Sequence, residues 1–496
     1  MVSRILFSVA ALLLSASAQN VGVLQKTLSA HGVSAVFPSD QDYGNASKAF
    51  NERFTFHPIA VAFPTSVTQV SAAVAAGAAQ NLEVVARSGG HSYVANGLGG
   101  RNGALVVDLS KLKTITVRSS NNTAIIETGN RLGDVALALN AHGRALPHGT
   151  CSYVGIGGHS GYGGFGFTSR AWGLALDTVR SATVVLGNGN IVTASPNANP
   201  DLFFAIRGAS PSFGIVTSIE VQTFPAPPSA IVFQYVWSNV DIKTASNGVA
   251  SFQSFAATNI PKEFGAELVF TAGNKKGLVN FGLTGAWYGD AALFNATLAP
   301  YLKTMPKNPS TTLTPGSYIN SVAFLAAPRP LNTSSAPDHP DTFYTKSLMT
   351  PSGSPMSNAA ITAFVSYMAN EGFTSDTNWF VEVELYGGSN SAINAVPLDS
   401  SAFAKRDTLF TIQFYASSST GAPPYPKDGF SFLDGMVASI VNNEPSSWPY
   451  GAYLNYIDDR LPNAAKLYYG SHLERLKTLK AKLDPKDTFQ FPVGIP

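Results

Sequence analysis

The sequence contains a single cysteine, Cys151, among 496 residues, so no disulfide bond can form within the chain. Charged residues are also scarce, at 12%, and 32 basic residues nearly balance 30 acidic ones. We therefore expect no binding of nucleic acid and a neutral substrate. Stability has to come from an apolar interior, and hydrophobic residues, which make up 45% of the chain, are sufficient to form one.

Long hydrophobic runs are absent after the first residues of the chain. The run from Ile5 to Leu14 follows Arg4 and precedes Ser15-Ala16-Ser17-Ala18, which is typical of a secretory signal peptide over residues 1–18. No later stretch is long enough to span a bilayer. We therefore expect a secreted, extracellular monomer with no membrane partner. Four glycosylation sequons fit a secretory route, at Asn45, Asn121, Asn295 and Asn332.

Motifs for metal or serine chemistry are missing as well. The eight histidines are scattered and include no HExxH, one cysteine excludes a cysteine-rich zinc site, and no GxSxG is present. We expect no metal. Gly161 to Gly166 matches GxGxxG, but it does not follow a first strand and no acidic residue lies about 20 positions later, as a Rossmann motif requires.

The length and the hydrophobic periodicity predict a two-domain α+β protein. In the first half, Gly187-Asn188-Gly189-Asn190 indicates a hairpin, Thr65 is expected to cap the first helix, and Pro200 is expected to open a later one. Strands are predicted at 60–63, 83–87, 104–109, 123–128 and 214–224, and helices at 65–80, 131–142 and 200–206.

Pro225-Ala226-Pro227-Pro228 breaks this pattern and predicts a domain boundary. Beyond it, alternating residues predict strands at 379–386 and 409–415. The Pro- and Ser-rich segments 306–315 and 328–340 are expected to be surface loops. A helix is predicted at 464–483, ending before Asp484-Pro485.

Glycine is dense between Gly149 and Gly173, and the pair Gly89-Gly90 precedes His91. Such runs let the backbone approach a flat or pyrophosphate-bearing ligand with its N–H groups turned inwards. A structural loop that binds no ligand would have the same composition. Cys151 lies in the same region, either as a small buried side chain or as a group that reacts.

Three segments resemble the flavin-binding signature of berberine-bridge-type FAD-linked oxidases. They are Arg87-Ser88-Gly89-Gly90-His91-Ser92-Tyr93, then Gly149-Thr150-Cys151, and the run from Gly155 to Gly166. The resemblance extends from Phe54 to Pro496 and is strongest to fungal glucooligosaccharide and chitooligosaccharide oxidases. It implies a vanillyl-alcohol-oxidase-type flavoprotein with an FAD-binding (PCMH-type) domain at 54–226, an antiparallel-sheet substrate domain at 229–442, and a C-terminal segment, 443–496, that returns to the FAD domain.

The resemblance also implies a doubly attached cofactor. His91 would bond the 8α-methyl carbon of FAD and Cys151 would bond C6, which requires a neutral imidazole and a thiolate. His159 either contacts the flavin or holds its own loop. The remaining cofactor contacts implied are Gly89, Gly90, Ser92, Tyr93, Gly149, Thr150, Val154, Gly157, Gly158, His159, Gly163, Gly166, Val216 and Asn455.

The proton acceptor of the family is the last tyrosine of Tyr453-Leu454-Asn455-Tyr456, so Tyr456 is the candidate base. A free tyrosine has a pKa of about 10, and Glu384 is the candidate carboxylate that assists it. Glucooligosaccharide oxidases have aspartate at this position, so Glu384 departs from the pattern by one methylene group. The substrate residues implied are Phe380, Glu382, Gln413 and Tyr453. The family often has tryptophan at the position of Phe380 and glutamine at the position of Glu382.

The expected reaction is oxidation of the reducing-end C1 hydroxyl of a sugar or oligosaccharide to a lactone, with O2 reduced to H2O2. Val154 resembles the oxidase pattern, whereas Ser152 replaces the usual proline and leaves a quinone-using dehydrogenase open. An oxidoreductase of the same fold that acts on a secondary metabolite, and a carbohydrate-binding protein without redox chemistry, also stay open. The polar set of Glu382, Glu384 and Gln413 favours a sugar, because its hydroxyl groups need partners in the site.

Overall fold

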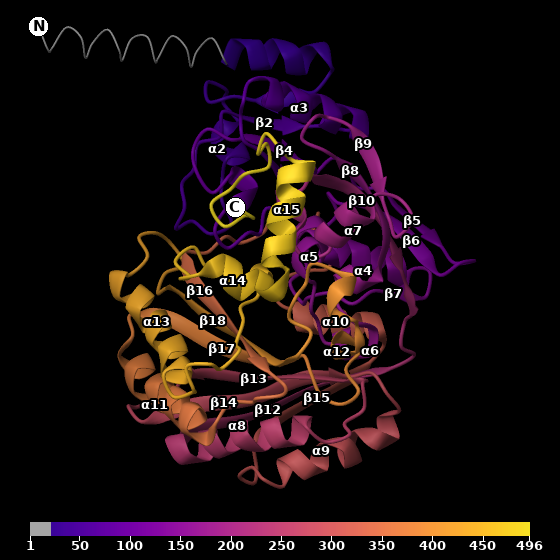
Figure 1. Ribbon diagram of the computed structural model, residues 1–496. Helices are drawn as coiled ribbons and strands as arrows, with labels where there is room; N and C mark the ends of the chain where they lie inside the picture. The colour runs from indigo at the N-terminus through magenta and orange to yellow at the C-terminus, as the bar shows by residue number, and fades with distance from the viewer. Residues whose placement is uncertain (1–20) are drawn as a thin grey trace, which may run out of the picture.

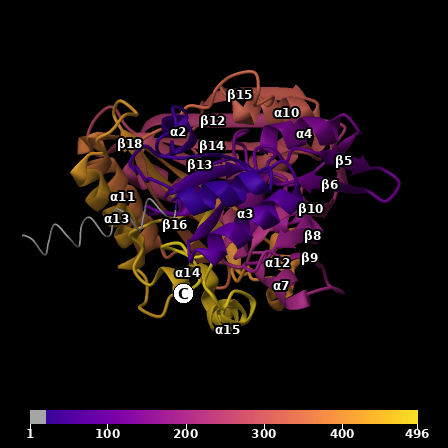
Figure 2. The ribbon, with the colours of Figure 1, turned by 90° about the horizontal axis from the view of Figure 1, so that it is seen from above.

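The computed structural model describes residues 21–496, and the predicted signal peptide lies outside them. Figure 1 shows two lobes: an upper one formed by the chain up to about residue 226 with the yellow C-terminal segment, and a lower one formed by the chain between them, from magenta to orange. Figure 2, which looks down on the molecule, shows α3 lying across the upper lobe. The predicted α+β class is confirmed.

The upper lobe contains two larger sheets and one two-stranded sheet. The first has the order β1-β2-β4-β3, with β2 and β3 parallel to the central β4. The second is antiparallel, with the order β5-β6-β10-β8-β9. Their strands are β1 (Ser34–Val36), β2 (Ala60–Phe63), β3 (Val84–Arg87), β4 (Leu105–Asp108), β5 (Ile115–Arg118), β6 (Thr123–Glu127), β8 (Val179–Val185), β9 (Ile191–Ala194) and β10 (Ile215–Gln222).

Short helices connect and cover these sheets. The helix α3 begins after Ser66, whose hydroxyl accepts the backbone N–H of Gln69 at 3.3 Å; the prediction that Thr65 caps it is therefore wrong by one residue. The predicted hairpin is confirmed as the antiparallel pair β8–β9. The other elements of this lobe are α2 (Tyr43–Ala46), α3 (Val67–Ala79), α4 (Leu132–Asn140), α5 (Ile156–Tyr162), α6 (Ser169–Trp172), α7 (Pro200–Ala205), β7 (Arg144–Ala145) and β11 (Phe224–Pro225).

The lower lobe is one antiparallel sheet with the order β15-β12-β14-β13-β17-β18-β16. Apolar side chains on one face of its strands pack against α8, α11 and α13, on the side away from the upper lobe (Figure 1). The strands are β12 (Ala230–Asp241), β13 (Phe264–Ala272), β14 (Leu278–Trp287), β15 (Ser310–Gly316), β16 (Phe343–Pro351), β17 (Thr377–Leu385) and β18 (Thr408–Ser418). The helices are α8 (Ile242–Ala256), α9 (Phe294–Leu302), α10 (Tyr318–Ala326), α11 (Asn358–Thr374), α12 (Ala392–Ala395) and α13 (Lys427–Val441).

Two predicted boundaries are wrong in this half of the chain. The segment 306–315 is not wholly a loop, because Ser310–Gly316 forms the edge strand β15, where its threonines suit a strand and Pro315 is tolerated. The helix predicted at 464–483 is two helices, α14 (Ala464–Tyr469) and α15 (Leu473–Leu483). Gly470, with a φ of 51°, separates them, because this left-handed backbone interrupts helical hydrogen bonding.

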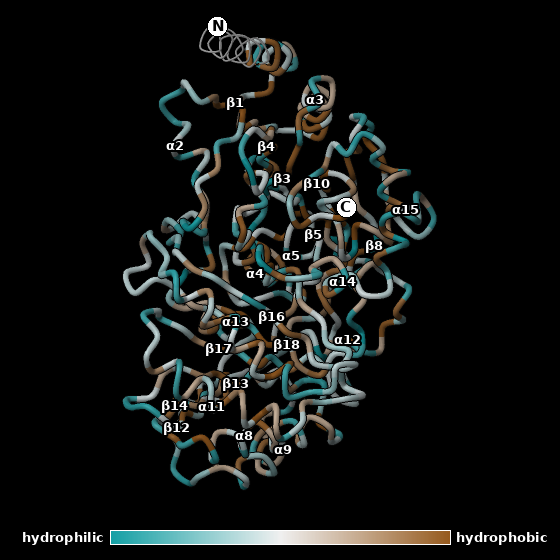
Figure 3. Tube along the Cα trace, turned by 60° about the vertical axis from the view of Figure 1, so that its left-hand side comes forward, coloured by the Kyte–Doolittle hydropathy of each residue, from teal (hydrophilic) through white to brown (hydrophobic). Residues whose placement is uncertain are grey.

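The C-terminal segment packs on the upper lobe. Lys480 Nζ donates to the Asp484 carboxylate at 2.7 Å and to the carbonyls of Ser212 at 3.0 Å and Phe489 at 3.1 Å. The backbone N–H of Ile495 donates to the Ser212 hydroxyl at 3.1 Å. Figure 3 shows hydrophobic stretches along the inner elements and hydrophilic ones mainly at outer turns. Within residues 21–496, no helix combines the length and hydropathy needed to cross a bilayer.

Candidate functional site

A cavity of about 290 Å³ runs between the lobes. Its walls come from the loop after β3, the loop and helix α5 after residue 149, one face of the lower sheet, and the 3₁₀ turn Leu454–Tyr456. All but two of the predicted site residues line it. Those that do are Gly89, Gly90, His91, Ser92, Tyr93, Gly149, Thr150, Cys151, Val154, Gly157, Gly158, His159, Gly166, Val216, Glu382, Glu384, Gln413, Tyr453, Asn455 and Tyr456.

Gly163 and Phe380 are the two residues outside the lining. A Cβ at Gly163 would lie 2.6 Å from the Tyr453 hydroxyl, so this glycine allows close packing of the loop against that ring. Phe380 stacks on Tyr415, with ring centroids 4.8 Å apart. It lies on the same face of β17 as Glu382 and Glu384, further along the strand.

The glycine-rich walls leave room for a thin ligand. A Cβ on Gly89 would lie 2.4 Å from the backbone nitrogen of Gly155, whereas one on Gly158 would meet no atom within 4 Å. Among the described residues, no backbone acceptor is paired with the N–H groups of Gly89, Gly90 or Ser92. Free N–H groups beside open space suit an anionic group such as a pyrophosphate.

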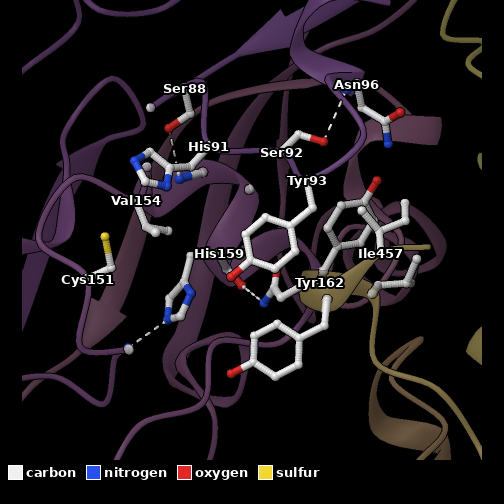
Figure 4. Close-up of a pocket in the computed structure, with 18 of the residues that line it drawn as sticks. Ser88, His91, Ser92, Tyr93, Asn96, Cys151, Val154, His159, Tyr162 and Ile457 are labelled. Carbon is white, nitrogen blue, oxygen red and sulfur yellow. Dashed lines mark hydrogen bonds between the residues drawn. The ribbon is translucent and has the colours of Figure 1, made fainter. Parts of the chain in front are cut away.

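His91 and Cys151 lie on the same side of this cavity, with Val154 between them in Figure 4. The His91 ring stacks on Phe50 at 3.8 Å, and its Nε2 lies 2.5 Å from Asp338 Oδ2. Burial lowers the pKa of His91, so its imidazole is neutral near pH 7. Burial raises the pKa of the Cys151 thiol, whereas the positive charge of Arg329 lowers it in part.

Sequence reasoning missed Asp338 and Arg329. They belong to the segment 328–340, which was expected to be a surface loop, but Leu331 is buried and Tyr153 donates a hydrogen bond to the carbonyl of Ala336 at 2.6 Å. The segment therefore covers part of the cavity wall. A Pro- and Ser-rich composition indicated a loop correctly but carried no signal of where that loop packs.

His159 holds its loop. Its Nε2 accepts a hydrogen bond from the backbone N–H of Gly149 at 3.0 Å (Figure 4). This bond fixes the loop segment that carries Cys151. Burial lowers the pKa of His159 to about 3, so the ring is neutral and able to accept. Asn455 Nδ2 donates to the carbonyl of His159 at 3.1 Å and connects this loop to the C-terminal segment. The geometry thus shows that His159 holds its loop, and its contact with the flavin stays a prediction.

The opposite end of the cavity is polar. The Tyr456 hydroxyl donates to Glu384 Oε1 at 2.7 Å, and the second oxygen of that buried carboxyl has no partner among the described residues. Burial, followed by the charge of Glu384, raises the pKa of Tyr456 well above its ordinary value. The phenol therefore needs an acceptor for its proton before it can serve as a base.

A third carboxyl group, from Glu267, joins Glu382 and Glu384. One carboxyl oxygen from each lies within 4.8 Å of the other two. Burial raises the pKa of Glu382 to about 7. Burial and the neighbouring carboxylates also raise the pKa of Glu267 and Glu384. Sequence reasoning missed Glu267, for which the only signal was a lone charge in an apolar strand.

The remaining aromatic residues frame this polar end. The Tyr93 ring stacks on Tyr456 with centroids 6.1 Å apart, and Gln413 Nε2 donates to the Tyr93 hydroxyl at 3.2 Å. The Tyr453 hydroxyl accepts the backbone N–H of Gly164 at 2.9 Å and of Phe165 at 3.3 Å. Tyr453 thus holds a loop, whereas Tyr456 faces the carboxyl groups.

Comparison with known proteins identifies the chain. Residues 58–195 match the FAD binding domain model, and residues 452–496 match the berberine and berberine-like model. The chain belongs to the berberine-bridge-type family of FAD-linked oxidases. The predicted family and the predicted fold are confirmed, and the free N–H groups and open glycine wall fit FAD.

The full length of this FAD-linked oxidase aligns with fungal enzymes. It is 37% identical to a carbohydrate oxidase of Microdochium nivale over 99% of both chains, and 38% identical to a chitooligosaccharide oxidase of Gibberella zeae over 92% of this chain and 90% of that one. Its fold matches the glucooligosaccharide oxidase of Acremonium strictum, which has a 6-S-cysteinyl, 8α-N1-histidyl FAD, with a TM-score of 0.88 and 34% identity over 95% and 99% of the two chains.

Proposed function

We propose that the enzyme oxidises the reducing-end carbon of a neutral sugar or oligosaccharide to a lactone and reduces O2 to H2O2. The observation that carries this proposal is the 2.7 Å hydrogen bond from Tyr456 to Glu384, in the same cavity as His91 and Cys151. A base facing a cofactor cavity is the arrangement that oxidation of an alcohol requires. The carbohydrate relatives support a sugar as the alcohol.

The cofactor is proposed to be FAD bound through His91 and Cys151. The support is the position of both side chains on one wall of the cavity, and the doubly attached FAD of the related glucooligosaccharide oxidase. When bound, FAD supplies the acceptor of the C1 hydride and passes its electrons to dioxygen. Two covalent bonds would hold the ring at a fixed place, which the alignment of donor and acceptor requires.

The protein's own groups then handle the proton. Tyr456 takes the proton of the anomeric hydroxyl while its own hydroxyl proton passes to the ionised carboxylate of Glu384, so the proton ends on Glu384, whose carboxyl group becomes neutral. Glu382, Gln413 and Glu267 offer hydrogen-bond partners for the other sugar hydroxyls. The lactone is released and opens in water to the aldonic acid.

The proposed reaction gives each part of the chain a role. Residues 54–226 form the FAD-binding domain, residues 229–442 present the substrate, and residues 443–496 bring Tyr456 back to the cofactor. We further propose a secreted, glycosylated monomer after removal of residues 1–18. The sequon asparagines are exposed, as glycosylation requires, at Asn45, Asn121, Asn295 and Asn332.

One oligosaccharide panel tests the reaction. Purified yellow enzyme is mixed anaerobically with gluco-, chito-, xylo- and cello-oligosaccharides, and flavin bleaching is followed, then repeated with oxygen and with a quinone. Bleaching by a sugar with H2O2 formation in air is the expected result. Bleaching without peroxide, but with rapid quinone reduction, would make the enzyme a dehydrogenase. A colourless protein would reject both flavin-dependent reactions and favour a carbohydrate-binding protein. A yellow protein that no sugar bleaches would favour a metabolite oxidoreductase.

A further inference from the structure

The segment between α10 and β16 brings a carboxylate against the histidine of the proposed flavin linkage. Asp338 Oδ2 lies 2.5 Å from His91 Nε2, and Phe50 stacks on the imidazole with ring centroids 3.8 Å apart. The side chains are shielded, with 7% of His91 and 18% of Asp338 exposed. The imidazole is therefore held in one orientation by a partner on Nε2 and a partner on its face.

This contact sets which ring nitrogen is reactive. A carboxylate can only accept, so Nε2 carries the proton and Nδ1 carries the lone pair of the neutral imidazole. Arg329 Nε donates to Asp338 Oδ1 at 3.2 Å. Burial disfavours the charge of Asp338, but the hydrogen bond with His91 and the charge of Arg329 outweigh it and hold the pKa of Asp338 below its ordinary value.

We propose that Asp338, kept ionised by Arg329, is the residue that positions His91 and accepts its Nε2 proton during covalent attachment of FAD. This inference rests on the proposed attachment through His91. It adds a residue that acts on the enzyme's own maturation, because Asp338 is not among the residues that line the cavity and has no part in the sugar reaction. The N1-histidyl linkage of the related glucooligosaccharide oxidase uses the nitrogen that Asp338 leaves free here.

The step balances as an oxidation. The bond from Nδ1 to the 8α carbon forms as one C–H bond of the methyl group breaks, and the electron pair of that bond remains on the isoalloxazine, which is reduced. The imidazole, now substituted at Nδ1, gives its Nε2 proton to Asp338. Dioxygen removes the two electrons, and the two protons that left the methyl group and the imidazole complete H2O2.

Attachment is measured without any sugar. Each variant is produced as full-length protein and denatured in acid, the retained flavin is quantified, and flavin-bearing peptides are mapped to His91 or Cys151. Asp338→Asn keeps the shape of the side chain but removes its charge, and it is expected to slow attachment at His91 by about 10² while attachment at Cys151 continues. Asp338→Glu restores a carboxylate and is expected to recover linkage at His91.

Asp341→Asn is the matched control. Asp341 lies three residues after Asp338, and its carboxylate accepts a hydrogen bond from the Tyr415 hydroxyl at 2.7 Å. Thermal unfolding reports whether each variant folds. Wild-type linkage at His91 in Asp338→Asn would overturn the proposal, and so would equal loss in folded Asp338→Asn and Asp338→Glu. If wild-type protein itself has no flavin on His91, the proposed double attachment fails instead, and the two failures are thus distinguished.

Discussion

Glu267 and Glu384 are directly opposite each other on the paired strands β13 and β17. Glu382, two residues before Glu384, lies on the same face and completes a group of three carboxyls in the cavity. Burial raises the pKa of all three carboxyl groups, and neighbouring carboxylates raise those of Glu267 and Glu384 further. The proposed proton acceptor, Glu384, therefore lies where negative charge is costly, because burial and then the charge of Glu382 raise its pKa.

A first prediction concerns the pH dependence of flavin reduction. Glu384 must be ionised to accept the Tyr456 proton, so the rate should rise with pH through the pKa of Glu384. Burial raises that pKa and the charge of Glu382 raises it further, so Glu382→Gln should move the acidic limb of the profile to lower pH. Anaerobic stopped-flow reduction across pH measures this. Glu474→Gln, on the exposed face of α15, is the control, and overlapping profiles for Glu382→Gln and wild type would contradict the prediction.

A second prediction concerns stability. Burial raises the pKa of Glu382 to about 7 in the folded state, whereas an unfolded glutamate has a pKa of about 4.3. Between these values the folded protein holds more protons than the unfolded chain, so its free energy of unfolding should fall as the pH rises from about 4.3 to about 7. Glu382→Gln should show a shallower fall. Thermal midpoints measured across this window should differ in slope; parallel curves would count against it.

Replacing the candidate base is the third test. Tyr456→Phe removes the phenol and keeps the ring that stacks on Tyr93, so sugar binding should survive. Anaerobic flavin reduction should slow by about 10² to 10⁴, the usual contribution of a positioned acid or base. A rate close to that of wild type would move the role away from Tyr456.

The neighbouring tyrosine should behave differently. Tyr453→Phe leaves the N–H groups of Gly164 and Phe165 without their acceptor, and each unpaired buried group costs about 1–3 kcal/mol. The variant should have a lower thermal midpoint while flavin reduction by sugar changes less than in Tyr456→Phe. A larger loss of rate than of stability would show that Tyr453 takes part in the chemistry.

The fifth prediction concerns oxygen. Val154 is half-buried in the cavity wall near His91 and Cys151. An added methylene group can close a small passage in a densely packed interior, so Val154→Leu should slow reoxidation in air and leave reduction by sugar nearly unchanged. Stopped-flow reoxidation decides this. Slow oxygen use by wild type, together with rapid quinone use, would assign a dehydrogenase.

Local chemistry in the sequence was sufficient for much of the fold. The hairpin around Gly187-Asn188-Gly189-Asn190 and the short helix opened by Pro200 depend on neighbours in the chain, and both are confirmed. Helix ends were harder to predict because Thr65 and Ser66 are both acceptable caps, and only the backbone decides between them. Gly470 divides the last helical segment, although an isolated glycine is often tolerated within a helix.

Some residues of the site could be predicted from local motifs, whereas others are brought together only by the fold. His91, Cys151 and Tyr456 lie in motifs whose spacing is visible in the chain, and all three line one cavity. Glu267 becomes a neighbour of Glu384 only through the pairing of β13 with β17, which no local pattern specifies. Asp338 meets His91 because an irregular loop crosses from one lobe to the other, and sequence composition does not determine the path of such a loop.

Lys480, which holds the C-terminal segment on the upper lobe, lies close to the end of the chain, so this contact forms late in synthesis. On the ribosome, His91 and Cys151 emerge early, whereas Tyr456 and the lysine that secures its segment emerge among the last residues. A nascent chain can therefore acquire the groups that hold its cofactor well before it acquires its proposed base. The upper lobe can close its core only when translation ends, because the same late segment supplies Ile457, Tyr469 and Leu476 to that core.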